Sequence, residues 1–231
     1  MKMLDDKQAQ ELEDNLRQRY ELEWDKSRVR DLSLKILQIK DLEAYLVSQI
    51  ESEAWSLENF PYWAMVWDAA LILADFMVAQ EPVPDRRILE VGAGLGFVGL
   101  FAAARGHQVT ITDNHPDALA FAMLSAYNNK LSAVSIQLLD WHHPELSQSY
   151  DWILGAELLY NPKFFAPLVE LCDRYLAPGG RIYLTQTAHF KGQYIFLEQT
   201  KNRFLVRYRE KTLLHDQEPQ TILFFELRRP D

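Results

Sequence analysis

From about residue 66 the chain alternates between short apolar runs and longer segments whose apolar residues recur at helical spacing. Such runs are typical of buried strands, and the spacing at i, i+3, i+4 and i+7 is typical of helices. The pattern predicts strands over 87–91, 107–113, 134–140, 150–159 and 181–188. It predicts helices over 66–80, 115–129 and 162–176, and a turn that leads into a helix over 92–106. Strands that alternate with helices indicate an α/β fold with a parallel sheet covered on both faces.

The pattern changes after the fifth strand. Residues 203–214 and 220–229 are rich in β-branched and aromatic side chains, and no helical spacing separates them. We predict that they form an antiparallel pair added to the edge of the parallel sheet. Few α/β cofactor domains end in this way.

The first 60 residues follow a third pattern. A charged segment over 4–23 has leucines at helical spacing, 28–39 is rich in β-formers, and 41–50 is suited to a short helix. We therefore expect an N-terminal helical and β extension, residues 1–60, that packs on a core domain of residues 61–231.

Composition narrows the class of protein. Of the 231 residues, 48% are hydrophobic and 25% are charged, which is ordinary for a globular protein in water. No apolar run would span a bilayer and the first residues hold no apolar signal core, so we expect a cytoplasmic protein that does not bind membranes. Cys172 is the only cysteine, which excludes an intrachain disulfide. The net charge of −9 argues against a large nucleic-acid interface and is compatible with a basic partner.

A glycine-rich turn follows the first strand of the parallel sheet, in the stretch ILEVGAGLGFVGL, residues 88–100. Glycine lets a ligand or another backbone come close, and such turns hold nucleotide-like cofactors in α/β proteins. Counted from Gly94, the stretch matches the G-x-G-x-x-G of nicotinamide- or flavin-binding proteins, with Asp113 near the expected distance for a ribose acid. That match starts too late, because the strand ends at Val91 and Gly92 opens the turn.

Counted from Glu90, the same turn resembles motif I of the seven-stranded, Rossmann-like methyltransferases that use S-adenosylmethionine (SAM). The resemblance implies that Gly92, Gly94 and Gly96 let the cofactor approach the backbone and that Glu90 suits its cationic amino-acid tail. It implies that Asp113 accepts hydrogen bonds from both ribose hydroxyls. After the third strand, Asp140 would accept from the adenine amino group and Trp141 would pack on the ring.

Two further segments resemble a family of protein lysine methyltransferases with a D/E-x-x-Y motif. Residues 157–160, ELLY, match that motif, and residues 61–76 resemble the segment that precedes motif I. The form PYWA-x-x-W is similar to the branch that modifies the electron-transfer flavoprotein β-subunit and to its bacterial relatives. The resemblance covers residues 60–190 and implies that Trp67 lies over the cofactor. It also implies that the strand end at Ala156 lies beside the cofactor methyl group.

The chemistry of methyl transfer explains why the motif would contain Glu157 and Tyr160. The nucleophile is a neutral amine, whereas a free lysine is protonated at pH 7. A partly dry slot must align nitrogen, methyl carbon and sulfur. A carboxylate and a phenol can orient the amine, and an aromatic face tolerates the developing cation. Two residues depart from the family pattern: Asp68 stands where many members have proline, and Glu157 replaces the commoner aspartate.

Several alternatives stay open at this point. A SAM-dependent methyltransferase for a small-molecule amine fits the same cofactor residues, because fold does not fix substrate. A non-catalytic SAM-fold protein and a nicotinamide oxidoreductase fit less well. The histidines form no zinc-binding set, so we predict no metal, and His107, His115 and His215 are expected in loops. We expect a monomer whose partner is a protein that presents a lysine.

Overall fold

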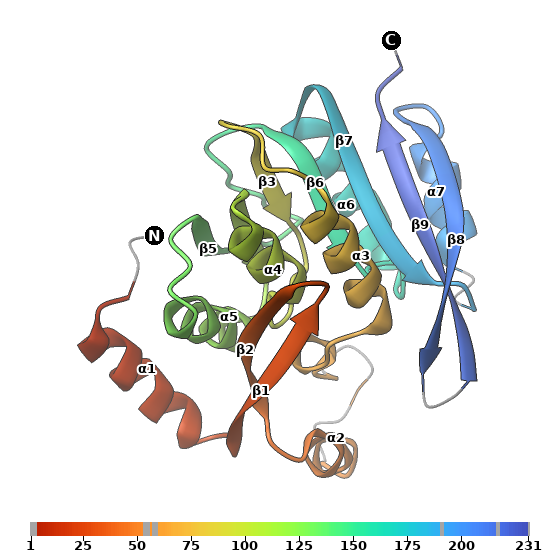
Figure 1. Ribbon diagram of the computed structural model, residues 1–231. Helices are drawn as coiled ribbons and strands as arrows, with labels where there is room; N and C mark the ends of the chain where they lie inside the picture. The colour runs from red at the N-terminus through yellow and green to blue at the C-terminus, as the bar shows by residue number, and fades with distance from the viewer. Residues whose placement is uncertain (1–3, 53–55, 57–59, 190–191, 216–217, 231) are drawn as a thin grey trace.

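A mixed sheet of seven strands forms the centre of the molecule (Figure 1). The structure is a computed structural model that describes residues 4–52, 56, 60–189, 192–215 and 218–230. Its strands run in the order β5-β4-β3-β6-β7-β9-β8. The parallel strands are β3 (Arg87–Glu90), β4 (Gln108–Asp113), β5 (Val134–Leu138), β6 (Tyr150–Ala156) and β7 (Leu176–Thr187).

The last two strands pair in the antiparallel sense, as predicted. β9 (Glu218–Arg228) pairs with β7, and β8 (Leu205–His215) pairs only with β9 and forms the sheet edge within the described chain. The predicted α/β fold with a terminal antiparallel pair is therefore confirmed.

Helices cover both faces of the sheet. One hydrophobic cluster joins side chains of α3 (Asp68–Ala79), α4 (Phe97–Arg105) and α5 (Pro116–Asn128). A second cluster, on the other face, joins α6 (Phe165–Tyr175) and α7 (Gly192–Thr200). The sequence pattern did not predict α7. Two of its three buried side chains, Gln193 and Thr200, are polar, so the helix has no continuous apolar stripe.

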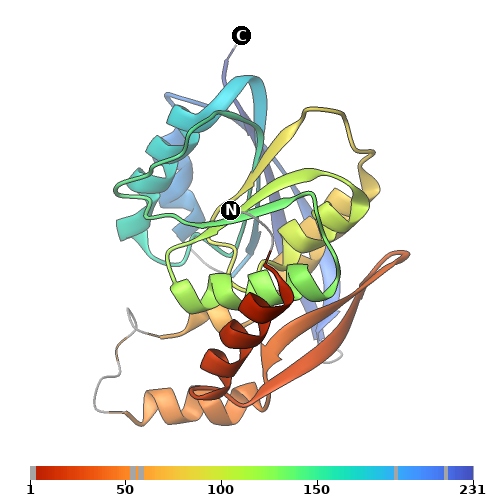
Figure 2. The same cartoon turned by 90° about the vertical axis from the view of Figure 1, so that its left-hand side faces the viewer.

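The N-terminal elements are α1 (Asp6–Arg17), the antiparallel pair β1 (Leu22–Val29) and β2 (Leu32–Ile39), and α2 (Leu42–Ile50). Of these, α1 and β2 lie against α5 (Figure 2). β2 is fixed to α5 by side chains, because the Leu37 amide donates to Ser125 Oγ at 3.0 Å and the Lys35 amide to Asn129 Oδ1 at 3.0 Å. β1 begins at Leu22, six residues before the predicted strand, in a segment whose polar side chains gave no clear alternation.

The carboxyl ends of β3, β4, β5, β6 and β7 meet at one edge of the sheet, because these strands are parallel. The predicted strand over 150–159 is shorter in the structure. β6 ends at Ala156, since Glu157 takes a left-handed conformation with φ of 53° and turns the chain. Among the described residues, no helix combines the length and the apolar character needed to cross a bilayer.

Candidate active site

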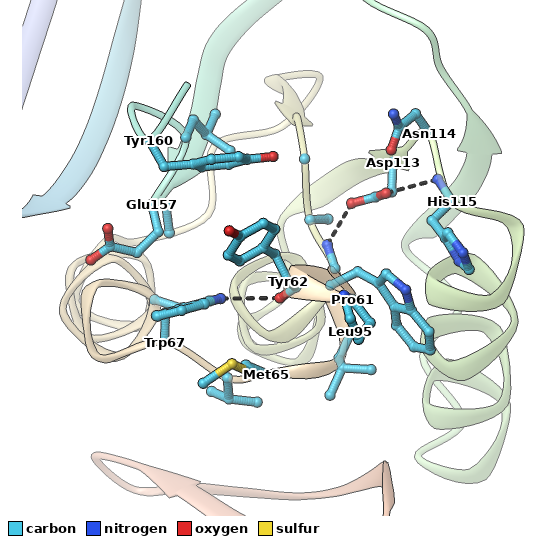
Figure 3. Close-up of a pocket in the computed structure, with 18 of the residues that line it drawn as sticks. Pro61, Tyr62, Met65, Trp67, Leu95, Asp113, Asn114, His115, Glu157 and Tyr160 are labelled. Carbon is cyan, nitrogen blue, oxygen red and sulfur yellow. Dashed lines mark hydrogen bonds between the residues drawn. The ribbon is translucent and has the colours of Figure 1, made fainter. Parts of the chain in front are cut away.

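A cavity of about 610 Å³ opens at the carboxyl edge of the parallel strands (Figure 3). Its floor is the glycine turn after β3, and its cover is the segment Pro61–Trp67 that precedes α3. All but one of the predicted site residues line it: Trp67, Glu90, Gly92, Gly94, Asp113, Asp140, Trp141, Ala156, Glu157 and Tyr160. The exception is Gly96. It begins α4, and a Cβ there would lie 3.0 Å from Ala122 Cβ, so its place is a helix contact.

Gly92 and Gly94 have backbone conformations that only glycine adopts without strain. Their φ angles are 59° and 54°. A Cβ on Gly92 would lie 2.7 Å from Leu158 and 3.1 Å from the Trp141 ring, and one on Gly94 would lie 2.8 Å from the Trp63 carbonyl oxygen. The turn therefore keeps a bare backbone under the cavity, as close approach of a ligand requires.

Asp113, at the end of β4, is buried and fixed by the backbone. Its Oδ2 accepts from the Gly94 amide at 2.8 Å and its Oδ1 from the His115 amide at 2.9 Å. Burial raises the pKa of this carboxyl, and the two amides oppose that shift. Each oxygen has capacity for a further hydrogen bond. The side chain can therefore accept from two neighbouring hydroxyls, as on a ribose.

Glu90 lies beneath the glycine turn and is 3% exposed. Its Oε2 accepts from the Gly99 amide at 2.8 Å in the first turn of α4. Burial is the largest cause that raises the pKa of the carboxyl to about 8, and the amides of Gly99 and Val98 lower it. Glu90 thus holds the start of α4 to β3 and supports the turn from below.

Replacing Glu90 with glutamine should remove a pH dependence of stability. Because the pKa is raised to about 8 in the folded chain, the folded state keeps a proton that the unfolded state loses above its ordinary pKa near 4.5. The contribution of Glu90 to the stability of the folded state is therefore fully present below its unfolded-state pKa near 4.5. It is lost as the pH rises through its folded-state pKa of about 8. Urea unfolding at pH 5 and pH 8 should show that the free energy of unfolding falls more between these pH values in the wild type than in Glu90→Gln, by more than about 1 kcal/mol. Equal losses would contradict the assignment.

Glu157 follows β6 directly and lies beside the end of β7. Its Oε1 accepts from the Thr187 amide at 2.9 Å and from the Thr187 hydroxyl, and its Oε2 accepts from the Gln186 amide group. Burial raises the pKa of the carboxyl, whereas the bonds from Thr187 lower it. A non-glycine residue with positive φ is strained, and such strain is concentrated at functional sites.

Tyr160, three residues after Glu157, lines the same cavity and packs on Tyr62. Its ring centroid is 4.9 Å from that of Tyr62, and the residue is 37% exposed. Burial raises the pKa of the phenol. The Tyr160 hydroxyl points across the cavity toward the side of Asp113, while the Glu157 carboxylate points away from it (Figure 3). The two polar groups of the motif therefore point in opposite directions, although both residues line the cavity.

The two predicted tryptophans occupy opposite walls. Trp67 precedes α3, and its indole Nε1 donates to the Tyr62 carbonyl at 3.1 Å, which holds the ring under Tyr62. Trp141 lies against Gly92 and meets Phe164 edge-on at a centroid distance of 6.3 Å. Asp140 is exposed and accepts from the His142 amide at 2.9 Å.

Sequence reasoning missed several residues of the wall. Tyr20 and Tyr45 line the cavity although they come from the N-terminal extension, which carries no motif. Trp63 also lines it; this residue lies in the PYWA segment but was not predicted as a site residue. Trp63 stacks on His115 at 4.7 Å with an interplanar angle of 17°. Only tertiary packing brings these rings together.

Of the three histidines predicted in loops, His107 and His115 lie outside helices and strands, whereas His215 is the last residue of β8. His115 is the N-cap residue of α5 and lines the cavity. His107 is 2% exposed, with a ring nitrogen 3.2 Å from the Met77 carbonyl oxygen. Across the described ranges, no three His, Cys, Asp or Glu side chains are grouped so that they could hold a metal ion.

The cavity fits SAM by size and by donor set. Its volume is typical of a small-molecule site. It offers a bare backbone turn, a carboxylate with capacity for two hydroxyls, and aromatic walls that suit an adenine and a sulfonium.

Comparison with known proteins agrees with this geometry. A family model described as lysine methyltransferase matches residues 59–203. The protein N-lysine methyltransferase METTL21A of Xenopus tropicalis is 33% identical over 149 residues, which cover 62% of this chain and 69% of that protein. The EEF1A lysine methyltransferase 3 of Mus musculus is 35% identical over 126 residues, which cover 52% of this chain and 54% of that protein.

A solved structure shows the same fold. The N-methyltransferase NodS of Bradyrhizobium japonicum, in complex with S-adenosyl-L-homocysteine, superposes with a TM-score of 0.57 over 83% of this chain and 100% of its own, at 16% identity. At that identity the likeness concerns the fold alone. The family match over residues 59–203 goes further. This chain therefore belongs to the lysine methyltransferase family and is a SAM-dependent methyltransferase.

Proposed function

We propose that the enzyme transfers the methyl group of SAM to a lysine side chain of a protein substrate, and that the lysine enters between Glu157 and Tyr160. The observation that carries the proposal is that one cavity brings both residues of the motif together with the glycine turn. Glu157, which is half-buried, and Tyr160 follow the end of β6 and line the same cavity as Gly92 and Gly94. The relatives METTL21A and EEF1A lysine methyltransferase 3, by their names, methylate lysines of proteins.

The proposed cofactor site uses the edge of the sheet from β3 to β6. Asp113 would accept from the ribose hydroxyls, and Gly92 and Gly94 would let the cofactor approach the backbone. Asp140 and Trp141 would meet the adenine. Glu90 would interact with the cationic amino-acid tail of SAM, in addition to accepting the hydrogen bond from the Gly99 amide of α4. When bound, SAM supplies an electrophilic methyl group on a positively charged sulfur.

The proposed lysine site must favour one orientation of an amine and exclude bulk water. The Glu157 carboxylate can accept a hydrogen bond from the amine and attract its charge. The rings of Tyr62 and Tyr160, which lie 4.9 Å apart, and the nearby indole of Trp67 offer faces that tolerate a cation. A slot of this kind favours an aligned amine over a solvated one.

Tritiated SAM tests the proposal against the small-molecule alternative. The enzyme is mixed with labelled SAM and a lysate of cells that lack its gene, and the lysate is separated into protein and small-molecule fractions. We expect label in a discrete protein band, and acid hydrolysis of that band should release methylated lysine. Label confined to the small-molecule fraction would instead support a metabolite amine. The narrower resemblance to the branch that modifies the electron-transfer flavoprotein β-subunit stays a prediction.

A further inference from the structure

β7 supplies two side chains that no sequence motif identified and that both touch Glu157. Gln186 is fully buried and Thr187 is 5% exposed. The Gln186 amide group donates to Glu157 Oε2, and the Thr187 hydroxyl and backbone amide donate to Oε1. The carboxylate therefore receives three donors from one strand end.

The orientation of the Gln186 amide is fixed by its other end. The Leu159 backbone amide, which can only donate, bonds to Gln186 Oε1 at 2.9 Å. The nitrogen of the same group must then face Glu157. Gln186 thus ties the first residue of the ELLY turn to the third and sets the shape of the turn that also presents Tyr160.

The donor count leaves little of the carboxylate free. A carboxylate has about four acceptor positions, two on each oxygen. Thr187 occupies both positions on Oε1, and Gln186 occupies one on Oε2. One position, on Oε2, remains for a substrate.

We propose that Gln186 and Thr187 are positioning residues: they hold Glu157 ionised in its buried place and leave a single acceptor position, on Oε2, for the substrate amine. The inference rests on the proposed role of Glu157. A hydrogen bond donated to a carboxylate favours its charged form, so the three donors oppose the effect of burial. Two other groups act on Glu157 electrostatically: Asp68 of α3 favours the neutral form, and His189, which follows β7, favours the charged form.

Two substitutions remove one donor each with little change in volume. Thr187→Val deletes the hydroxyl and keeps the backbone amide, and Thr187→Ser restores a hydroxyl. Gln186→Met removes the amide nitrogen that donates to Glu157 and the amide oxygen that accepts from the Leu159 amide. Gln193→Met is a matched control, because Gln193 is another buried glutamine, on α7, whose amide donates to the Ala188 carbonyl at 3.2 Å and not to Glu157.

Infrared difference spectra between each variant and the same variant carrying Glu157→Gln report the pH at which Glu157 takes up a proton, with no need for a substrate. Thr187→Val and Gln186→Met should raise that pH by about one unit, since each loses a charge-assisted bond. In Thr187→Ser and Gln193→Met, Glu157 should take up its proton at the same pH as in the wild type. Unchanged titration in folded Thr187→Val and Gln186→Met would overturn the inference.

Labelling rates with tritiated SAM and the same lysate give the second readout. Thr187→Val and Gln186→Met should be slower by about tenfold or more with unchanged SAM affinity, and Thr187→Ser should recover most of the rate. If Glu157→Gln is slow while both β7 variants are fast, the positioning inference alone fails. If Glu157→Gln is as fast as the wild type, the proposed role of Glu157 fails, whatever the infrared titration shows.

Discussion

Replacing Glu157 with glutamine is expected to slow methyl transfer by roughly 10²-fold or more, while SAM affinity stays within about twofold of the wild type. The substitution keeps the length of the side chain. It removes the negative charge that favours the positive charge developing on the aligned amine during transfer. It also replaces one of the two carboxylate oxygens with an NH2 group, which cannot accept a hydrogen bond. The three donors of Gln186 and Thr187 are then left with a single acceptor oxygen, so they cannot all be satisfied. Single-turnover labelling measures the rate, and calorimetry measures the SAM affinity.

Tyr160→Phe is the companion variant. It removes only a hydroxyl from a ring that still packs on Tyr62, so its rate should fall less than that of Glu157→Gln. A wild-type rate for Glu157→Gln would contradict the assignment of the motif. Loss of SAM binding together with activity would instead place Glu157 at the cofactor and favour a small-molecule substrate.

Replacing Asp113 with alanine is expected to weaken SAM binding by about 1.5–3 kcal/mol, the range for a hydrogen bond to a charged group. The side chain has a second effect, because it also holds the amides of Gly94 and His115. Without it the buried Gly94 amide loses its partner and the glycine turn loosens under the cavity. Calorimetry gives the affinity, and the SAM-induced rise in melting temperature should shrink in parallel.

Asp117→Ala is a matched control for Asp113→Ala. Asp117 lies in the first turn of α5 and accepts from Arg19 and from the Tyr20 hydroxyl, the latter at 2.6 Å, but it does not line the cavity. Its loss should lower the melting temperature and leave the SAM affinity of the folded protein nearly unchanged. Equal affinity losses in both variants would mean that Asp113 acts through stability and not by contact with the cofactor.

The parallel part of the fold was predictable because each element carries its own periodicity. The strands that became β3 to β6 are short apolar runs, and Pro116 and Gly106 mark the beginning of α5 and the end of α4. Two elements were not predictable in this way. β1 alternates weakly, and the buried side of α7 is largely polar. The predicted fourth strand was too long, because apolar Leu158 and Leu159 continue the run past the left-handed turn at Glu157.

The candidate site was predictable where a strand ends in a polar or glycine residue, as at Gly92, Asp113 and Glu157. The cover was only partly predictable: Trp67 was identified by resemblance, whereas Trp63, Tyr20 and Tyr45 were not. Nor could Gln186 and Thr187 be found, since in sequence they are ordinary polar residues of a buried strand. Their role depends on the parallel register that places Thr185, two residues before Thr187, beside Ala156.

The position of β9 in the sheet determines when, during synthesis of the chain, the enzyme becomes able to transfer methyl groups. β9 pairs with Gln186 through Leu223 and with Thr187 through Ile222, yet it is made after every other strand described here. A nascent chain that has emerged only as far as β8 leaves β7 as an open edge, free to pair with other chains. The glycine turn and Asp113 lie far upstream, so these segments emerge long before β9, the strand that pairs with Gln186 and Thr187 of β7. Ribosome stalling between β8 and β9 should thus yield a chain that aggregates readily and does not methylate.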